Sequence, residues 1–360
     1  MERIELRGCL ETELTELCQE LGLKRFRAQQ LFRWVQQKGV HTWEEMHNIS
    51  ETERQKLRTL LNLSPLKLLR VQRAQDGTRK YLFGLEDGES IECVLMNYER
   101  DTTRNRHTVC VSTQVGCAVG CAFCATGLGG FCRDLSVGEI VGQVLEISRW
   151  MSQEDPLSKV TNVVFMGMGE PLLNYEAVLK ALEILNQESG QNIGMRRMTI
   201  STSGVAPKIR QLARDNPQVG LAVSLHSALD SVRDALVPIN RRYPLNELMN
   251  ACSEYIELTN RRITFEVALI AGEVNQDCAE ALGKLLQGYL AHVNLIPVNP
   301  VAETKMGRPK TEELYEFART LESYAIPVSI REERGTDINA ACGQLRGQWK
   351  VDKDESFSPL

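Results

Sequence analysis

The stretch that decides the fold is residues 107–133, His-Thr-Val-Cys-Val-Ser-Thr-Gln-Val-Gly-Cys-Ala-Val-Gly-Cys-Ala-Phe-Cys-Ala-Thr-Gly-Leu-Gly-Gly-Phe-Cys-Arg. Within it Cys117, Cys121 and Cys124 form a C-x3-C-x2-C triplet, whose thiolates can converge on one metal centre. A closed structural zinc site takes four ligands. Three cysteines suit a [4Fe-4S] cluster with one open iron, because a protein-saturated cluster uses four. An open iron can bind a small molecule through that molecule's own donor atoms.

Outward from this loop, strand-like and helix-like segments alternate as far as residue 332. Such alternation predicts a parallel sheet, either open or closed into a barrel. About six units are too few for a complete eight-fold barrel, which favours a partial (β/α)6 barrel within residues 107–345. The expected strands are residues 109–113, 162–166, 197–201, 221–225, 263–269, 293–297 and 328–331.

Two smaller parts precede the predicted barrel. Residues 1–63 have the pattern of a helical module of the helix-hairpin-helix type, with Ser50-x-x-Glu53 as a capping box. Residues 64–106 contain two Asp-Gly turns that predict a three-stranded β-meander, followed by a polar connection taken as a domain boundary. Residues 346–360 are expected to form a polar tail.

Composition points to a cytoplasmic globular protein of 360 residues, 42% of them hydrophobic and 25% charged. No run approaches the roughly 18 apolar residues of a membrane span, and the first residues lack the apolar region of a secretory signal. In a reducing compartment, the eleven cysteines are expected to be thiols, metal ligands or catalytic groups. A net charge of −5 still permits a local basic patch, and either a solvated helix face or an RNA-backbone contact explains the cluster of Lys24, Arg25, Arg27 and Arg33.

Polar residues gather where the predicted barrel strands end. In a parallel barrel the active site lies at the carboxyl ends of the strands. The cysteine loop follows the first strand, and Gly169-Glu170 follows the second in a turn where a carboxylate can accept from a ligand's ammonium group. Ser201, His226 and Asn299 end or follow later strands. Asn174 is expected to cap the helix that follows the second strand.

At these positions the sequence resembles a known family. The triplet with Phe123 before its third cysteine is the signature of radical S-adenosylmethionine (SAM) enzymes. Longer matches are similar to the RlmN/Cfr family of RNA methyltransferases, and closest to its RlmN branch. These matches are residues 110–117, 165–174, 201–204, 224–226, 237–240, 294–300 and 337–345.

The resemblance implies the cofactors and the reaction. Cys117, Cys121 and Cys124 would hold the [4Fe-4S] cluster, whose open iron binds the amino and carboxylate groups of SAM. The reaction would be methylation at C2 of an adenosine in 23S rRNA and, in some bacteria, in tRNA. Radical chemistry is needed because an aromatic C2–H is neither acidic nor nucleophilic. The family's SAM-contacting positions correspond to Gly169, Glu170, Ser201, Ser224, Leu225, His226 and Asn299.

Two further cysteines and a carboxylate take catalytic roles by the same resemblance. Cys342 would carry the methyl group and become linked to the RNA, and Cys110 would release the product through a transient Cys110–Cys342 disulfide. Glu92 falls at the family's proposed proton-acceptor position. We expect a monomer that takes electrons from a donor such as flavodoxin.

Two other interpretations stay open. A Cfr-like enzyme would methylate C8 of the same adenosine. A zinc-containing, non-catalytic RNA-binding protein would instead use the cysteine loop as a structural site, with Cys132 as a candidate fourth ligand.

Overall fold

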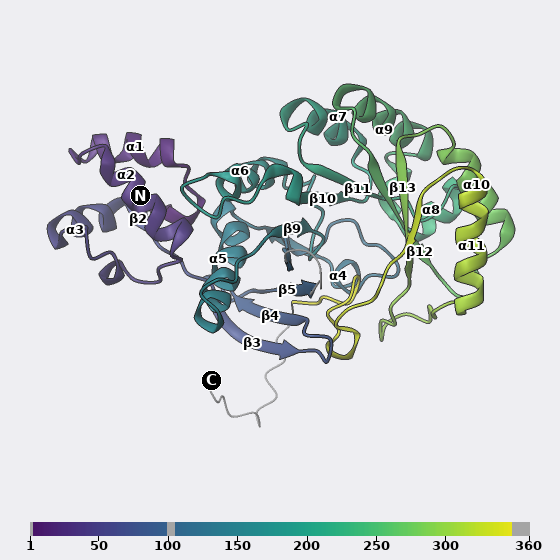
Figure 1. The fold of residues 1–360 in the computed structure, drawn as a ribbon, viewed down its shortest axis with the longest axis horizontal. Coiled ribbons are helices and arrows are strands. Elements are labelled where there is room, and N and C mark those ends of the chain that lie inside the picture. The colour runs from purple at the N-terminus through teal and green to yellow at the C-terminus, as the bar shows by residue number, and fades with distance from the viewer. Residues whose placement is uncertain (1–2, 99–104, 348–360) are drawn as a thin grey trace.

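The computed structural model describes residues 3–98 and 105–347 and contains a helical module attached to a mixed sheet (Figure 1). Most of the predicted polar connection and nearly all of the predicted polar tail lie outside the described residues. In the described part of the chain, no helix is long and apolar enough to cross a membrane.

The N-terminal module is built from short helices. Ser50 accepts from the Glu53 backbone N–H, and the Glu53 carboxylate accepts in return from the Ser50 backbone, which confirms the predicted capping box. A parallel pair of short strands, β1 (Ile4–Glu5) and β2 (Leu61–Asn62), closes the module by joining its two ends. The remaining elements are η1 (Leu6–Gly8), α1 (Glu11–Glu20), α2 (Phe26–Phe32), the π-helix η2 (Arg33–Gln37), η3 (Trp43–Glu45) and α3 (Glu51–Leu60).

One ten-stranded sheet forms the body of the molecule, in the order β14-β13-β12-β11-β10-β9-β6-β5-β4-β3. From β6 to β14 all neighbouring strands are parallel, which confirms the predicted barrel strands. The parallel strands are β6 (Arg106–Cys110), β9 (Asn162–Phe165), β10 (Met198–Thr202), β11 (Gly220–Ser224), β12 (Ile263–Leu269), β13 (Ala291–Pro297) and β14 (Val328–Ile330). A curved sheet of this kind is the predicted partial barrel.

Helices in the crossovers cover the outer face of the parallel strands (Figure 1). They are α5 (Val137–Glu154), α6 (Tyr175–Asn186), α7 (Ala206–Asp215), α9 (Leu245–Thr259), α10 (Gln276–Leu286) and α11 (Thr311–Ser323). Shorter elements lie in the connections: α4 (Ala125–Leu128), η4 (Met195–Arg197), α8 (Asp230–Leu236), η5 (Pro238–Arg241) and η6 (Thr336–Ile338). Asn174 takes the predicted N-cap position of α6, but its side chain makes no capping hydrogen bond; its amide donates to the backbone oxygens of Thr113 and Leu135, at 2.9 and 2.8 Å.

The predicted meander is present and continues the barrel sheet. Its strands β3 (Lys67–Arg73), β4 (Arg79–Gly84) and β5 (Ser90–Tyr98) are antiparallel and are joined at the two Asp-Gly turns. β5 then pairs antiparallel with β6, with Val94 opposite Cys110. The meander therefore lies beside the first barrel strand, and its side chains can reach the active-site end of the sheet.

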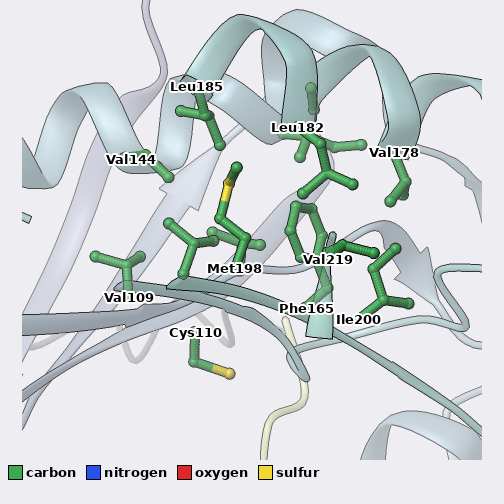
Figure 2. Packing of buried hydrophobic residues seen from close by; sticks show 14 of the residues in the cluster. Val109, Cys110, Val144, Phe165, Val178, Leu182, Leu185, Met198, Ile200 and Val219 are labelled. Atoms are coloured by element: carbon green, nitrogen blue, oxygen red, sulfur yellow. The ribbon is translucent and has the colours of Figure 1, made fainter. Parts of the chain in front are cut away.

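The main core lies between the sheet and the covering helices. Val109, Phe165 and Met198 from three strands pack with Leu182 and Leu185 of α6, all fully buried (Figure 2). The Cys110 thiol lies on the opposite face of the strands, away from these helices (Figure 2). Alternation along a strand explains this, because successive side chains point to opposite faces. Cys110 thus faces the inside of the partial barrel.

Candidate active site

A short hairpin closes the base of the cysteine loop. β7 (Gln114–Gly116) pairs antiparallel with β8 (Phe131–Asp134), and the Cys117 backbone N–H donates to the Gly130 oxygen at 2.8 Å. Gly116 has a φ of +75°, and a Cβ there would lie 2.0 Å from the Gly130 oxygen, so only glycine fits. Sequence reasoning missed this hairpin, because its strands are too short for a periodic pattern.

The cysteine triplet lines one cavity at the carboxyl ends of the barrel strands. Cys117, Cys121 and Cys124 all contribute to its wall. In the described residues, no group of three or more His, Cys, Asp or Glu side chains is placed to hold one metal ion. A cluster does not need that convergence, because each thiolate bonds a different iron. The three sulfurs on one loop, facing one cavity, therefore fit a [4Fe-4S] cluster.

Most of the predicted SAM-contacting residues line the same cavity, from four different strand ends. They are Gly169, Glu170, Ser201, Ser224, His226 and Asn299. The Glu170 carboxylate is buried and accepts from the Ser203 backbone and hydroxyl, both at 2.7 Å, and from the Leu172 backbone at 3.1 Å. These bonds fix the carboxylate at the cavity wall and leave accepting capacity for a bound ammonium group.

His226 is held as a neutral imidazole. It has a φ of +60°, and its Nδ1 accepts from the Ala268 backbone N–H at 3.0 Å. Burial, and next the charge of Arg233, lower the pKa of His226 to about 3. Its ring packs edge-to-face on Phe123, with centroids 4.8 Å apart. The aromatic residue before the third cysteine therefore orients a residue on a different strand end.

Leu225 does not line the cavity. Its side chain is fully buried, its backbone N–H donates to the Glu266 oxygen, and its own oxygen accepts from Arg233 at 3.0 Å. Arg233, also fully buried, donates further to Ser203, Ser224 and Asn240. One turn later on α8, the Leu236 oxygen accepts from the Ala122 backbone at 3.0 Å, which anchors the cysteine loop.

The two other predicted catalytic cysteines meet in an adjoining cavity. Cys110 and Cys342 both line it, and Cys342 also lines the first cavity. Asn299 donates to the Cys342 oxygen at 3.2 Å, and the Ala125 backbone donates to the Gly343 oxygen at 2.7 Å. Both sulfurs are free thiols. Burial raises the pKa of Cys110 to about 12 and also raises that of Cys342, although the Arg331 guanidinium opposes the latter rise.

Sequence reasoning missed a charged pair beside these thiols. Arg331 lines both cavities, and its guanidinium lies 3.9 Å from the Glu266 carboxylate, which also accepts from Asn294 at 3.0 Å. Burial raises the pKa of Glu266. A signal was available, because a glutamate within the apolar run Ile263–Leu269 is unusual for a buried strand.

Glu92 and Cys132 stand apart from both cavities. Neither residue is part of the wall of the two cavities. Glu92 is buried on β5 and pairs with Lys80 on β4, with Nζ and Oε1 3.0 Å apart. Cys132 is exposed on β8.

Comparisons with known proteins agree with this geometry. The family model described as the Radical SAM superfamily matches residues 111–285, and the one described as the ribosomal RNA large subunit methyltransferase N-terminal domain matches residues 4–63. A protein of Desulfitobacterium hafniense (strain DSM 10664 / DCB-2), named a probable dual-specificity RNA methyltransferase RlmN, is 66% identical over 98% of this chain and 99% of its own. The protein of that name from Bacillus subtilis is 45% identical over 98% and 96%. A radical SAM methyltransferase structure from Sphaerobacter thermophilus superposes with a TM-score of 0.91 at 46% identity, covering 96% of this chain and 100% of that one.

Proposed function

The chain belongs to the RlmN family of radical SAM RNA methyltransferases, and we propose that it methylates C2 of an adenosine in 23S rRNA. The family assignment overturns the alternative of a non-catalytic zinc protein, because members use a [4Fe-4S] cluster and SAM. We extend the proposal to tRNA as a second substrate, since the relatives are named dual-specificity enzymes.

The observation that carries this proposal is the shared position of Cys342. Cys342 lines both the cavity that contains the three cysteines of the triplet and the adjoining cavity that contains Cys110. When bound, the cluster and SAM supply a 5′-deoxyadenosyl radical that can take a hydrogen atom from a methyl group on sulfur. Before that, Cys342 would lose its thiol proton and take the methyl group from a first SAM molecule, so that an S–C bond forms and S-adenosylhomocysteine leaves. A thiol between the two cavities can therefore present its methyl carbon to both SAM and an incoming adenine.

Cys110 is placed to release the product. Its deprotonated sulfur would attack the sulfur of Cys342, so that an S–S bond forms while the bond between that sulfur and the RNA-linked carbon breaks. Before this step the RNA-linked adduct would give up its C2 hydrogen as a proton and its unpaired electron to the cluster. The electron pair of the broken bond then stays with the carbon, which takes up a proton as the methylated base forms. The resulting disulfide must then be reduced, and we assign both this step and cluster reduction to an external donor such as flavodoxin.

The helical module is the proposed RNA-binding part. Lys24, Arg25 and Arg33 are exposed, and Arg25 and Arg33 line an open groove with Phe26. Arg27 instead forms an ion pair with Glu53, with a nitrogen–oxygen distance of 2.8 Å, and is not counted among the RNA-contacting residues. The basic residues that remain can contact a phosphate backbone.

The regiochemistry is tested by product analysis. We expect 2-methyladenosine when holoenzyme, SAM and reductant act on unmodified 23S rRNA or tRNA and the digested nucleosides are analysed by mass spectrometry. 8-Methyladenosine as the main product would establish the Cfr-like alternative. Cys342→Ala should abolish methylation and keep reductive SAM cleavage, whereas Cys278→Ala, at a half-buried cysteine on α10, should retain both.

A further inference from the structure

A buried ion pair lies on the meander, outside the walls of both cavities. Lys80 and Glu92 are 7% and 8% exposed, and Nζ lies 3.0 Å from Oε1. In the β4–β5 register Lys80 is opposite Val94 and Leu82 is opposite Glu92, so the pair is diagonal on one face of the sheet. Burying two charges is costly unless their remaining hydrogen-bonding capacity is used. The other partners of this pair therefore indicate its role.

Those partners belong to the segment that carries Cys342. Lys80 Nζ donates to the Asn339 backbone oxygen at 3.1 Å. Glu92 Oε2 accepts from the backbone N–H groups of Arg346 at 2.7 Å and Gly347 at 3.4 Å. Asn339 precedes Cys342 and Arg346 follows it, so the two charges hold this segment on both sides of the thiol.

The segment needs such support because it has little regular structure. After η6 no helix or strand occurs in the described residues up to 347. Asn339 and Gly343 have φ values of +52° and +82°, in the left-handed region that asparagine and glycine adopt more readily than other residues, so the chain turns at both without regular structure. Its conformation is therefore set by contacts with the rest of the protein.

Both Glu92 carboxylate oxygens have partners, and Glu92 is not among the residues that line either cavity. Oε1 faces Lys80, and Oε2 faces the backbone of Arg346 and Gly347. The Glu92 backbone is itself held, because the Ser112 hydroxyl donates to its oxygen at 2.6 Å. A carboxylate held in this way fixes a chain segment and is not part of the wall of the cavity in which Cys110 and Cys342 meet.

We infer that the Lys80–Glu92 pair is a positioning device that holds Cys342 between the SAM cavity and Cys110. Glu92 would thereby act on the reaction through the Cys342 segment and not as the proton acceptor. This inference rests on the proposed function, because it requires Cys342 to carry the methyl group. Reductive SAM cleavage depends on the first cavity, whose wall includes neither charge. Loss of the pair therefore uncouples methyl transfer from SAM cleavage.

The test compares Lys80→Met with Arg79→Met in the full-length holoenzyme. Arg79 is the adjacent residue on β4, and its ion pair with Glu154 at 2.7 Å does not involve the Cys342 segment. Cys342 accessibility is measured as the rate of alkylation by iodoacetamide, followed by peptide mass spectrometry. We expect Lys80→Met to raise that rate and to lower RNA methylation by roughly tenfold each, as loss of charge-assisted hydrogen bonds allows. In Lys80→Met, formation of 5′-deoxyadenosine should stay within about twofold of the wild type. Arg79→Met should match the wild type in Cys342 alkylation, RNA methylation and 5′-deoxyadenosine formation.

Other variants keep the test decisive if Lys80→Met folds poorly. Lys80→Arg keeps the charge and should restore most of the Cys342 protection. Glu92→Gln keeps one accepting oxygen for the Arg346 backbone and should raise alkylation by a smaller factor. If Cys342 stays protected in every variant while Glu92→Gln abolishes methylation, Glu92 is a proton acceptor and the inference is wrong. Methylation of RNA by Cys342→Ala would instead overturn the proposed function.

Discussion

Asn299 donates its side-chain amide to the backbone oxygen of Cys342, and this bond joins the loop after β13 to the segment that carries the proposed methyl group. Asn299 is also one of the residues expected to contact SAM, and it lines both cavities. A single side chain thus connects the SAM site to the thiol that the proposed function places next to it.

Asn299→Ala should weaken both SAM binding and Cys342 methylation. One hydrogen bond is worth about 1 kcal/mol, so loss of the expected Asn299 contact to SAM should lower SAM affinity by roughly fivefold. Loss of the bond to the Cys342 oxygen should slow Cys342 methylation further. SAM binding is measured by equilibrium dialysis and Cys342 methylation by mass spectrometry of the protein. Asn246→Ala, at an exposed position on α9, is the control. Normal Cys342 methylation at saturating SAM would show that the hydrogen bond from Asn299 to Cys342 does not contribute to the reaction.

The iron content of cysteine variants should distinguish the proposed cluster ligand Cys121 from Cys132, which we do not expect to bind iron. Cys121 lines the cavity, whereas Cys132 is exposed on β8. After anaerobic reconstitution, wild type and Cys132→Ser should each hold about four irons per chain, and Cys121→Ser should hold far fewer. Iron and acid-labile sulfide analysis provides the measurement. Loss of iron in Cys132→Ser would identify it as a fourth ligand.

Arg233→Met should destabilise the fold at the active-site end of the sheet. This buried guanidinium donates to the backbone oxygens of Ser203, Ser224 and Leu225, and each of them would lose this donor. We expect the free energy of unfolding to fall by about 3 kcal/mol. Arg210→Met removes only partly exposed pairs with Glu247 and Glu254 and should cost less than about 1 kcal/mol. Equal urea midpoints for the two variants would contradict this account.

Local patterns predicted a large part of this structure. The cysteine spacing located the cluster loop, the Ser50 capping box marked the start of a helix, and the Asp-Gly turns defined the meander. These signals work because each depends on residues close together in the chain. The strand-end rule likewise brought Glu170 and His226 to one cavity without knowledge of tertiary contacts.

Features that depend on distant contacts were not predicted. Lys80 is a basic residue near the first Asp-Gly turn, and no local pattern links it to Asn339, which lies in another part of the chain. Asn174 stands at the predicted N-cap position, yet its amide bonds to Thr113 and Leu135 link α6 to distant parts of the chain, which no local pattern indicates. Glu266 could be recognised as unusual, but its pairing with Arg331 required the folded sheet.

The helical module is attached to the barrel through Glu146 on α5. Its carboxylate, 3% exposed, accepts from Arg7 of η1 at 2.7 Å and lies 2.8 Å from His41 Nε2. Burial raises the pKa of Glu146, but the His41 hydrogen bond and the charge of Arg7 lower it more, so the net pKa lies below its ordinary value of 4.5. A carboxylate with a depressed pKa stabilises the folded state when it is ionised.

Glu146→Gln should therefore destabilise the protein in a pH-dependent way. Above pH 4.5 the wild-type carboxylate is charged in both states and its stabilisation is complete. Below that value the unfolded chain takes up the proton first, and the stabilisation is lost as the pH falls through the lower, folded-state pKa. At pH 7 we expect a cost of about 3 kcal/mol, because the fully buried Arg7 loses its charged partner. Urea unfolding of wild type and variant from pH 7 to pH 3 measures the difference, with Glu183→Gln, at an exposed position on α6, as the control. If the difference in free energy of unfolding between wild type and Glu146→Gln stayed constant from pH 7 to pH 3, the charge of Glu146 would not stabilise the attachment of the helical module to the barrel.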